Sequence, residues 1–209
     1  MADNLTTQSG TLATIPSSTT VATDEISGIH YQKFKLFDGT ADSTTAAKVS
    51  SAGAVNVDNQ LSVTRIQVTP TISTSPAYSA KDALGGRLDF ANAARTSGGG
   101  ITIRSITIVD LAQQKAEIDI IFFRASFTAP TDNAIFAPSS GALADCIGFV
   151  PIFASDYADF SANCVASKQA VGLQATLSAT TLYAALVIRG TYTYLTTSDI
   201  EVTLDIEQH

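Results

Sequence analysis

Few side chains in this 209-residue sequence are suited to acid–base chemistry. Histidine occurs twice, at His30 and at His209, so a Ser-His-Asp triad would have to use His30. That residue lies in a predicted strand next to a polar segment, which is a poor position for a general base. The sequence contains no G-x-S-x-G, P-loop, G-x-G-x-x-G or H-E-x-x-H motif. We therefore expect no catalytic residue and no enzymatic activity.

Two carboxylate pairs, Glu117/Asp119 and Glu201/Asp205, have the residue types that glycosidases use. Both pairs alternate with apolar residues, which is typical of the solvent-facing side of an antiparallel strand. The chain also has no Trp that would stack on a sugar ring. We interpret these carboxylates as surface residues.

Metal binding is equally weakly indicated. Asp132 and the pair Asp156/Asp159 are acidic residues in predicted loops, but calcium needs about six to eight oxygen ligands and no D-x-D-x-D loop occurs. The two cysteines, Cys146 and Cys164, form no C-x-x-C motif and are too few for a disulfide scaffold. We expect them to be free thiols in the core, and we expect no metal and no cofactor.

The composition is acidic, poorly charged and rich in hydroxyl groups. The net charge is -7, only 15% of residues are charged, and there are 31 Ala, 27 Thr and 21 Ser. Twelve basic residues scattered along the chain do not form a phosphate-binding surface, so we expect no nucleic-acid partner. No apolar run reaches the roughly 18 residues of a membrane span, and we expect a soluble protein made in a cytosol. A surface with so few charges favours an oligomer or an assembly component over a monomer.

Alternation of apolar and polar residues dominates the chain from residue 60 onward. It predicts strands at 61–69, 86–92, 101–110, 116–123, 146–153, 169–177, 182–195 and 200–206. The phase of the alternation changes at Arg104–Ser105, which predicts a β-bulge there. Residues 130–141 are predicted to be a loop with one helical turn. The fold class predicted is all-β, an antiparallel β-sandwich with jelly-roll connectivity.

The N-terminal part differs from this body. The first 23 residues carry one charge and have no regular period, and only residues 29–37 alternate as a strand does. We therefore predict an extended N-terminal arm and linker at 1–59 and a β-sandwich domain at 60–209. Apolar residues within a segment that has no core of its own are candidate assembly contacts. They are Ile15, Val21, Ile29, Tyr31, Phe34 and Leu36.

Residues 21–49 resemble a segment of virion structural proteins of tailed bacteriophages, where the pattern V-A-T-D-x-x-x-G-x-x-Y-Q-x-x-K-L-x-D-G-T is familiar. The positions shared with that pattern include Asp24, Gly28, Tyr31, Gln32, Lys35, Asp38, Gly39 and Thr40. The stretches 77–95, 127–139 and 182–206 are also similar to such proteins. The resemblance implies a capsid decoration (cement) protein, a head fibre or a related virion surface component, often trimeric with a β-sandwich body.

The extended arm favours the decoration protein, since such a protein must lie across neighbouring subunits. We therefore expect a virion structural protein on the capsid surface, with the major capsid protein and further copies of itself, as a homotrimer, as partners. Bound copies would stabilise the assembled shell by mass action. The alternative is a receptor- or glycan-binding module of a tail or head fibre, in which Tyr157, Tyr192 and Tyr194 would line a shallow sugar site.

Overall fold

The computed structural model describes residues 23–26, 29–32 and 62–209. The chain divides into two units, Met1–Asn59 and Gln60–His209. In the first unit, strand β1 (Thr23–Ile26) pairs antiparallel with strand β2 (Ile29–Gln32). A hairpin with such short strands is at best marginally stable alone in water. The rest of the strand predicted at 29–37 lies outside the described residues.

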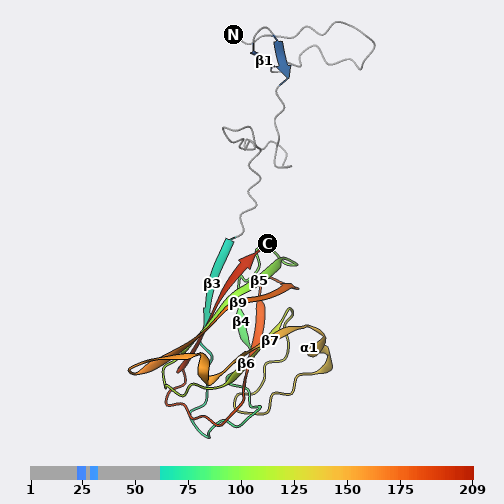
Figure 1. Cartoon of the computed structure of the whole chain (residues 1–209). Helices are drawn as coiled ribbons and strands as arrows, with labels where there is room; N and C mark the ends of the chain where they lie inside the picture. The colour runs from blue at the N-terminus through green and yellow to red at the C-terminus, as the bar shows by residue number, and fades with distance from the viewer. Residues whose placement is uncertain (1–22, 27–28, 33–61) are drawn as a thin grey trace. The chain divides into compact units, whose positions relative to one another are not determined.

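The second unit is a sandwich of two antiparallel sheets (Figure 1). The four-stranded sheet has the order β4 (Leu88–Phe90), β10 (Leu182–Ile188), β6 (Ile118–Phe123) and β7 (Cys146–Ile152). The five-stranded sheet has the order β3 (Ser62–Val68), β11 (Ile200–Gln208), β5 (Gly100–Asp110), β9 (Asn163–Thr176) and β8 (Tyr157–Phe160). The two described helices are short, α1 (Ser140–Ala144) and η1 (Ala154–Asp156). The all-β, antiparallel sandwich is thus confirmed, while jelly-roll connectivity stays a prediction.

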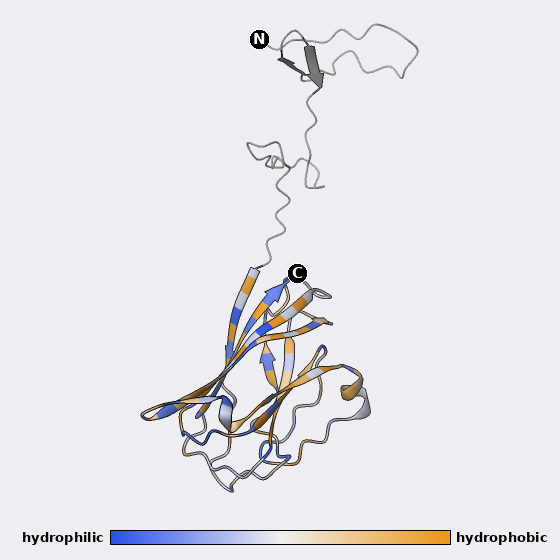
Figure 2. Cartoon of the chain, in the orientation of Figure 1, coloured by the Kyte–Doolittle hydropathy of each residue, from blue (hydrophilic) through white to orange (hydrophobic). Residues whose placement is uncertain are grey.

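The core lies between the sheets and follows the alternation of the sequence. Along β11, Ile200, Val202, Leu204 and Ile206 are fully buried, whereas the acidic residues between them are only half-buried. Figure 2 shows the same alternation of apolar and polar residues along β3. Strands with one buried face and one polar face gain stability only in one register, because a one-residue shift would expose the whole apolar set.

The bulge predicted at Arg104–Ser105 is present. Ser105 pairs with Asp205 but Ile103 pairs with Ile206, so Arg104 has no partner in β11. On the other side of β5, Ser105 pairs with Gln169 and Ile103 with Leu173. The bulge therefore interrupts the pairing of β5 with both of its neighbours.

Three boundaries predicted from the sequence were wrong. The strand predicted at 169–177 is the second half of β9, which begins at Asn163, and the preceding strand β8 was not predicted. The strand predicted at 182–195 ends at Ile188, because the chain turns at Arg189–Gly190. The helical turn predicted within 130–141 is helix α1 at Ser140–Ala144, where the Ser139 side chain accepts a hydrogen bond from the Ala142 amide.

One end of the body is defined by the pairing of β3 with β11. Ser62 pairs with Gln208 at this end, and the Ser62 hydroxyl donates to the Gln208 side chain (3.2 Å). The opposite end of the same sheet is where Val68 pairs with Val202 and Ile200 with Asp110. The chain therefore enters the sandwich beside its C-terminal strand.

Candidate functional site

The structure describes only part of the assembly contacts predicted from the sequence. Ile29 and Tyr31 are in β2, opposite Ile26 and Asp24 of β1. Ile15, Val21, Phe34 and Leu36 lie outside the described residues. The described residues of the body contain a different surface that is suited to binding another protein.

That surface is built on residues 124–145, which we call the cap. The cap connects β6 to β7 and contains helix α1. Its two ends are joined, because the Arg124 amide donates to the Asp145 carbonyl (2.9 Å) and Arg124 Nε lies 2.8 Å from Asp145 Oδ1. Long connections that are ordered in this way are commonly functional.

The cap packs on the outer face of the four-stranded sheet. Phe127 of the cap is 8% exposed and stacks on Phe123 of β6, with ring centroids 4.2 Å apart. These two rings form a second apolar cluster with Ala185 of β10. Phe136 and Ala142 of the cap pack against the same cluster. Burial of aromatic rings therefore holds the cap on the sheet.

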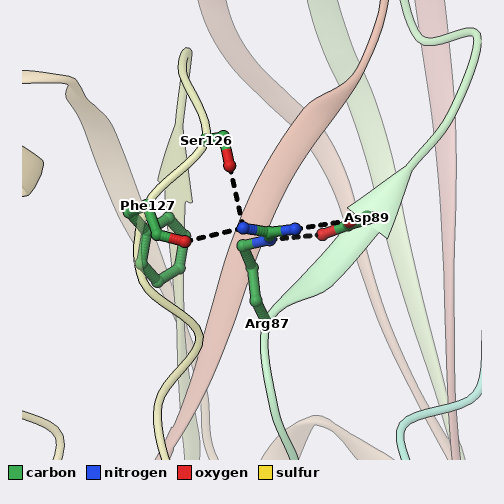
Figure 3. Close-up of polar contacts among 4 residues, drawn as sticks. All are labelled: Arg87, Asp89, Ser126 and Phe127. Atoms are coloured by element: carbon green, nitrogen blue, oxygen red, sulfur yellow. Dashed lines mark hydrogen bonds and ion pairs between the residues drawn. The ribbon is translucent and has the colours of Figure 1, made fainter.

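Arg87 fixes the start of the cap (Figure 3). Its guanidinium forms a bidentate pair with Asp89, with Nε 2.6 Å from Oδ1 and an NH group 2.9 Å from Oδ2. The same side chain donates to the Ser126 hydroxyl (2.8 Å) and to the Phe127 carbonyl (2.6 Å). It also lies 4.9 Å from the ring centroid of Tyr183. The hydrogen bond with Asp89 raises the pKa of Arg87, so the guanidinium stays charged and its charge is paired.

Asp132 fixes the middle of the cap. Its carboxylate accepts hydrogen bonds from the Tyr78 hydroxyl (2.6 Å), the Gly85 amide (2.6 Å) and the Ser73 hydroxyl. Burial and the Asp132 carboxylate together raise the pKa of Tyr78 well above its ordinary value. Gly85 has a φ of +77, and a Cβ there would lie 2.7 Å from Pro70 Cβ, so the close approach requires glycine. Asp132, considered above as a calcium ligand, is thus bonded to three protein donors.

Backbone pairing continues from Asp132 into the next residues of the cap. The Ala83 amide donates to the Ala134 carbonyl (2.9 Å), and the Phe136 amide donates to the Lys81 carbonyl (2.9 Å). Segment 81–84 is bonded in turn to β10, since the Leu84 amide donates to the Leu186 carbonyl (2.9 Å). The stretches 77–95 and 127–139 therefore contact each other in space.

Three large apolar side chains remain exposed on and beside the cap. Ile135 is 70% exposed, Leu143 of α1 is 53% exposed, and Phe149 of β7 is 59% exposed. Phe149 is the cross-strand neighbour of Ile121, which packs against the cluster under the cap. Exposed apolar residues on a rigid, charge-paired segment are characteristic of protein-binding surfaces.

The other candidate chemical groups are engaged in structural contacts. Asp119 pairs with Arg189 (2.5 Å), and Asp205 accepts from the Ser105 hydroxyl (2.7 Å). His209 Nε2 lies 2.8 Å from the Thr102 hydroxyl. Asp119, Asp205 and His209 therefore each have a protein partner.

The remaining acidic loop residues also pair with cations. Asp156 lies 2.7 Å from Lys168 Nζ, and Asp159 lies 2.6 Å from Lys115 Nζ. In the described ranges, no three His, Cys, Asp or Glu side chains come together as a metal site. Of the two cysteines, Cys164 is buried as expected, whereas Cys146 is only partly buried, and both are free thiols.

The three tyrosines considered for a sugar site do not form one exposed surface. Tyr157 and Tyr194 are buried, and the Tyr157 hydroxyl donates to the Ala116 carbonyl (3.0 Å). Tyr192 is half-buried, and its hydroxyl accepts from the Glu117 amide (3.0 Å). Burial raises the pKa of both Tyr157 and Tyr194. These side chains stabilise one end of the core.

Comparison with protein-family models and with curated proteins finds no match for this chain. None of the helices in the described part of the chain has the length and apolar character needed to cross a bilayer. The cap was not recognised as a site from sequence, although PTDNAIFAP, a loop sequence with two prolines and the adjacent apolar residues Ile135 and Phe136, was a usable signal.

Proposed function

We propose that this protein is a non-enzymatic virion structural protein that binds the outer surface of a phage capsid as a decoration protein. Its partners would be the major capsid protein and further copies of itself. The observation that carries the proposal is the cap, which presents Ile135 and Leu143 on a segment held by Arg87 and Asp132, with the exposed Phe149 of β7 beside it. A rigid apolar surface loses little conformational entropy on binding.

The charge pairing of the cap supports a protein partner. Arg87 is paired with Asp89 and Arg124 with Asp145, so these charges attract neither phosphates nor metal ions strongly. The resemblance of segments 77–95 and 127–139 to phage virion proteins points to the same region, since both segments form the cap and its support.

The test is binding of the purified protein to capsids that lack it, measured as occupancy by quantitative gel analysis of sedimented shells. We expect the double variant Ile135→Asp/Phe149→Asp to bind at least about tenfold more weakly. The control is Val63→Asp, which adds one negative charge at a residue that is 57% exposed on β3. Equal occupancy of the double variant and the wild type would mean that the cap does not contribute to capsid binding.

A second variant tests the N-terminal unit. Removal of residues 1–45 should leave a folded body, checked by circular dichroism, and should abolish decoration because the arm supplies the bridging contact. If wild-type protein bound no shell but bound host cells or glycans, the fibre alternative would replace the decoration proposal.

A further inference from the structure

Three loops lie together at the end of the body opposite to Ser62, the lower end of the body in Figure 1. They comprise residues 69–80, 111–114 and 190–198, and we call them the distal loops. The Ile72 amide donates to the Thr197 carbonyl (3.0 Å), and the Leu111 amide donates to the Asp199 carbonyl (2.8 Å). The distal loops are therefore one continuous surface and not three independent tips.

This surface carries no Asp, Glu, Lys or Arg. At the chain-wide charged share of 15%, the 25 residues of the three loops would contain about four charges. Its exposed residues are mostly Thr and Ser, and they surround Leu195, 79% exposed, and Leu111, 42% exposed. Leu195 has a larger exposed fraction than any other large apolar residue of the described chain.

Two charged residues at the border of the distal loops, Lys115 and Arg189, are paired, while a third, Lys81, follows residues 69–80 and is exposed. Lys115 Nζ lies 2.6 Å from Asp159, and an Arg189 NH group lies 2.5 Å from Asp119. The net negative charge of the protein is therefore carried by other parts of its surface.

The backbone that presents Leu195 is fixed by a buried carboxylate. Asp199 accepts from the amides of Leu195 and Thr196, each at 2.8 Å, and from the Thr196 hydroxyl at 2.5 Å. Holding an exposed apolar side chain in one position does not stabilise the isolated body. It does reduce the conformational entropy that is lost when the side chain is buried on association.

We propose that the distal loops are the surface through which copies of this chain associate with one another. In a cyclic oligomer, a residue close to the symmetry axis lies near the same residue of the other subunits. A charged residue there would therefore be repelled by like charges. A protein with a net charge of -7 can place only an uncharged surface at such an axis without repulsion. The distal loops meet this requirement, and Leu195 and Leu111 supply apolar area to bury.

The inference rests on the self-association included in the proposed function, but it does not depend on shell binding. Its test is sedimentation velocity of the full chain from about 1 to 100 µM, for the wild type and the double variant Leu195→Asp/Leu111→Asp. Val63→Asp is the matched control, because Val63 is also exposed but lies in β3, toward the opposite end of the sheet. Thermal unfolding checks that all three proteins are folded.

We expect the wild type and Val63→Asp to form the same oligomer and the double variant to dissociate, with an association constant at least about tenfold weaker. Raising NaCl from 0.05 to 1 M should strengthen the wild-type oligomer, because salt screens the repulsion between acidic copies and leaves apolar contacts intact. A monomeric wild type, or an oligomer that the double variant retains, overturns the inference. Shell occupancy of the same variants, measured separately, shows whether decoration fails along with self-association.

Discussion

The cap and the distal loops are both long irregular segments, but different interactions order them. The cap is held by buried aromatic side chains, with Phe127 stacked on Phe123, and by the charged side chain of Arg87. The distal loops also bury an aromatic pair, Tyr78 and Tyr194, with ring centroids 5.9 Å apart, but the backbone beside their exposed residue Leu195 is held by the Asp199 carboxylate, which accepts the amides of Leu195 and Thr196. A loop ordered by burial should be sensitive to truncation of apolar side chains. One ordered by a carboxylate should be sensitive to loss of the acceptor and to pH.

Truncating the aromatic anchor of the cap should give the largest effect. We expect Phe127→Ala to lower the free energy of unfolding by about 3 kcal/mol, because a buried ring is lost and a cavity is left. Urea denaturation monitored by circular dichroism measures it. Ile135→Ala, in the same cap but 70% exposed, should change stability by less than about 0.5 kcal/mol. Similar losses for both variants would mean that the cap is not held by burial.

Removing the acceptor that orders residues 195–199 should have the next largest effect. Asp199→Ala leaves two amides and the Thr196 hydroxyl without their partner, and we expect a loss of about 2 kcal/mol. Faster limited proteolysis within 190–198 should accompany that loss. The control is Thr197→Ala, an exposed position in the same loop whose backbone bond to Ile72 is retained. A loop that stays protease-resistant without Asp199 would remove the contrast between the two regions.

Replacing the bidentate pair of the cap should have a smaller effect. Arg87→Lys keeps the charge but cannot donate to Asp89, Ser126 and Phe127 together, and we expect a loss of about 1 kcal/mol since the pair is partly exposed. Urea denaturation at two salt concentrations measures the loss of unfolding free energy and shows how far salt reduces it. Arg65→Lys, on exposed β3, is the matched control and should have no measurable effect.

The dependence of the unfolding free energy on pH should be the smallest effect. It distinguishes most clearly between carboxylates whose pKa is lowered and carboxylates whose pKa is raised on folding. Burial alone would raise the pKa of Asp199, but hydrogen bonds from Thr196 and Leu195 outweigh it and lower that pKa below its ordinary value of 3.8. The stabilisation is therefore complete above the unfolded pKa and is lost as the pH falls through the folded one. We expect Asp199→Asn to flatten the acid side of a plot of unfolding free energy against pH.

Asp110, at the base of the 111–114 loop, should behave in the opposite way. Burial raises its pKa, although the amides of Lys115 and Ala112 donate to it. Protonation then favours the folded state, so stability is lost as the pH rises through the folded pKa. Asp110→Asn should remove that loss. The same slope for both variants would contradict the assignment of the two carboxylates.

Regular alternation made much of the body predictable from sequence. Strand β11 was predicted because large apolar residues alternate with polar residues along it. The bulge in β5 was predicted because the phase of the same alternation changes at Arg104–Ser105. The first half of β9 was missed because Ala166 is its small buried residue and Ser167 and Lys168 follow without alternation. Residues 191–194 were wrongly predicted as a strand because Thr and Tyr favour strands, whereas the structure has only an isolated bridge there, between Tyr192 and Tyr78.

The candidate surfaces were much less predictable. Arg87 acts on the cap through Ser126 and Phe127, about 40 residues away, and Asp132 acts through Ser73 and Tyr78, more than 50 residues away. No local pattern encodes such contacts, because they depend on how the sheet brings distant loops together. The distal loops were not predicted either: the absence of charged residues from these three stretches can be read from the sequence, but only the structure shows that they lie together.

The pairing of Ser62 with Gln208 has a practical consequence for protein engineering. Because β3 and β11 are antiparallel neighbours with these residues in register, a short turn of about two to four residues could join His209 to Ser62 as an ordinary hairpin. New termini could then be opened between the exposed residues Gln113 and Gln114, at the opposite end of the same sheet, giving a circularly permuted body with an unchanged sheet order. Such a permutant would move the attachment point of a fused peptide along the molecule, so that the same sandwich could carry cargo from a different edge.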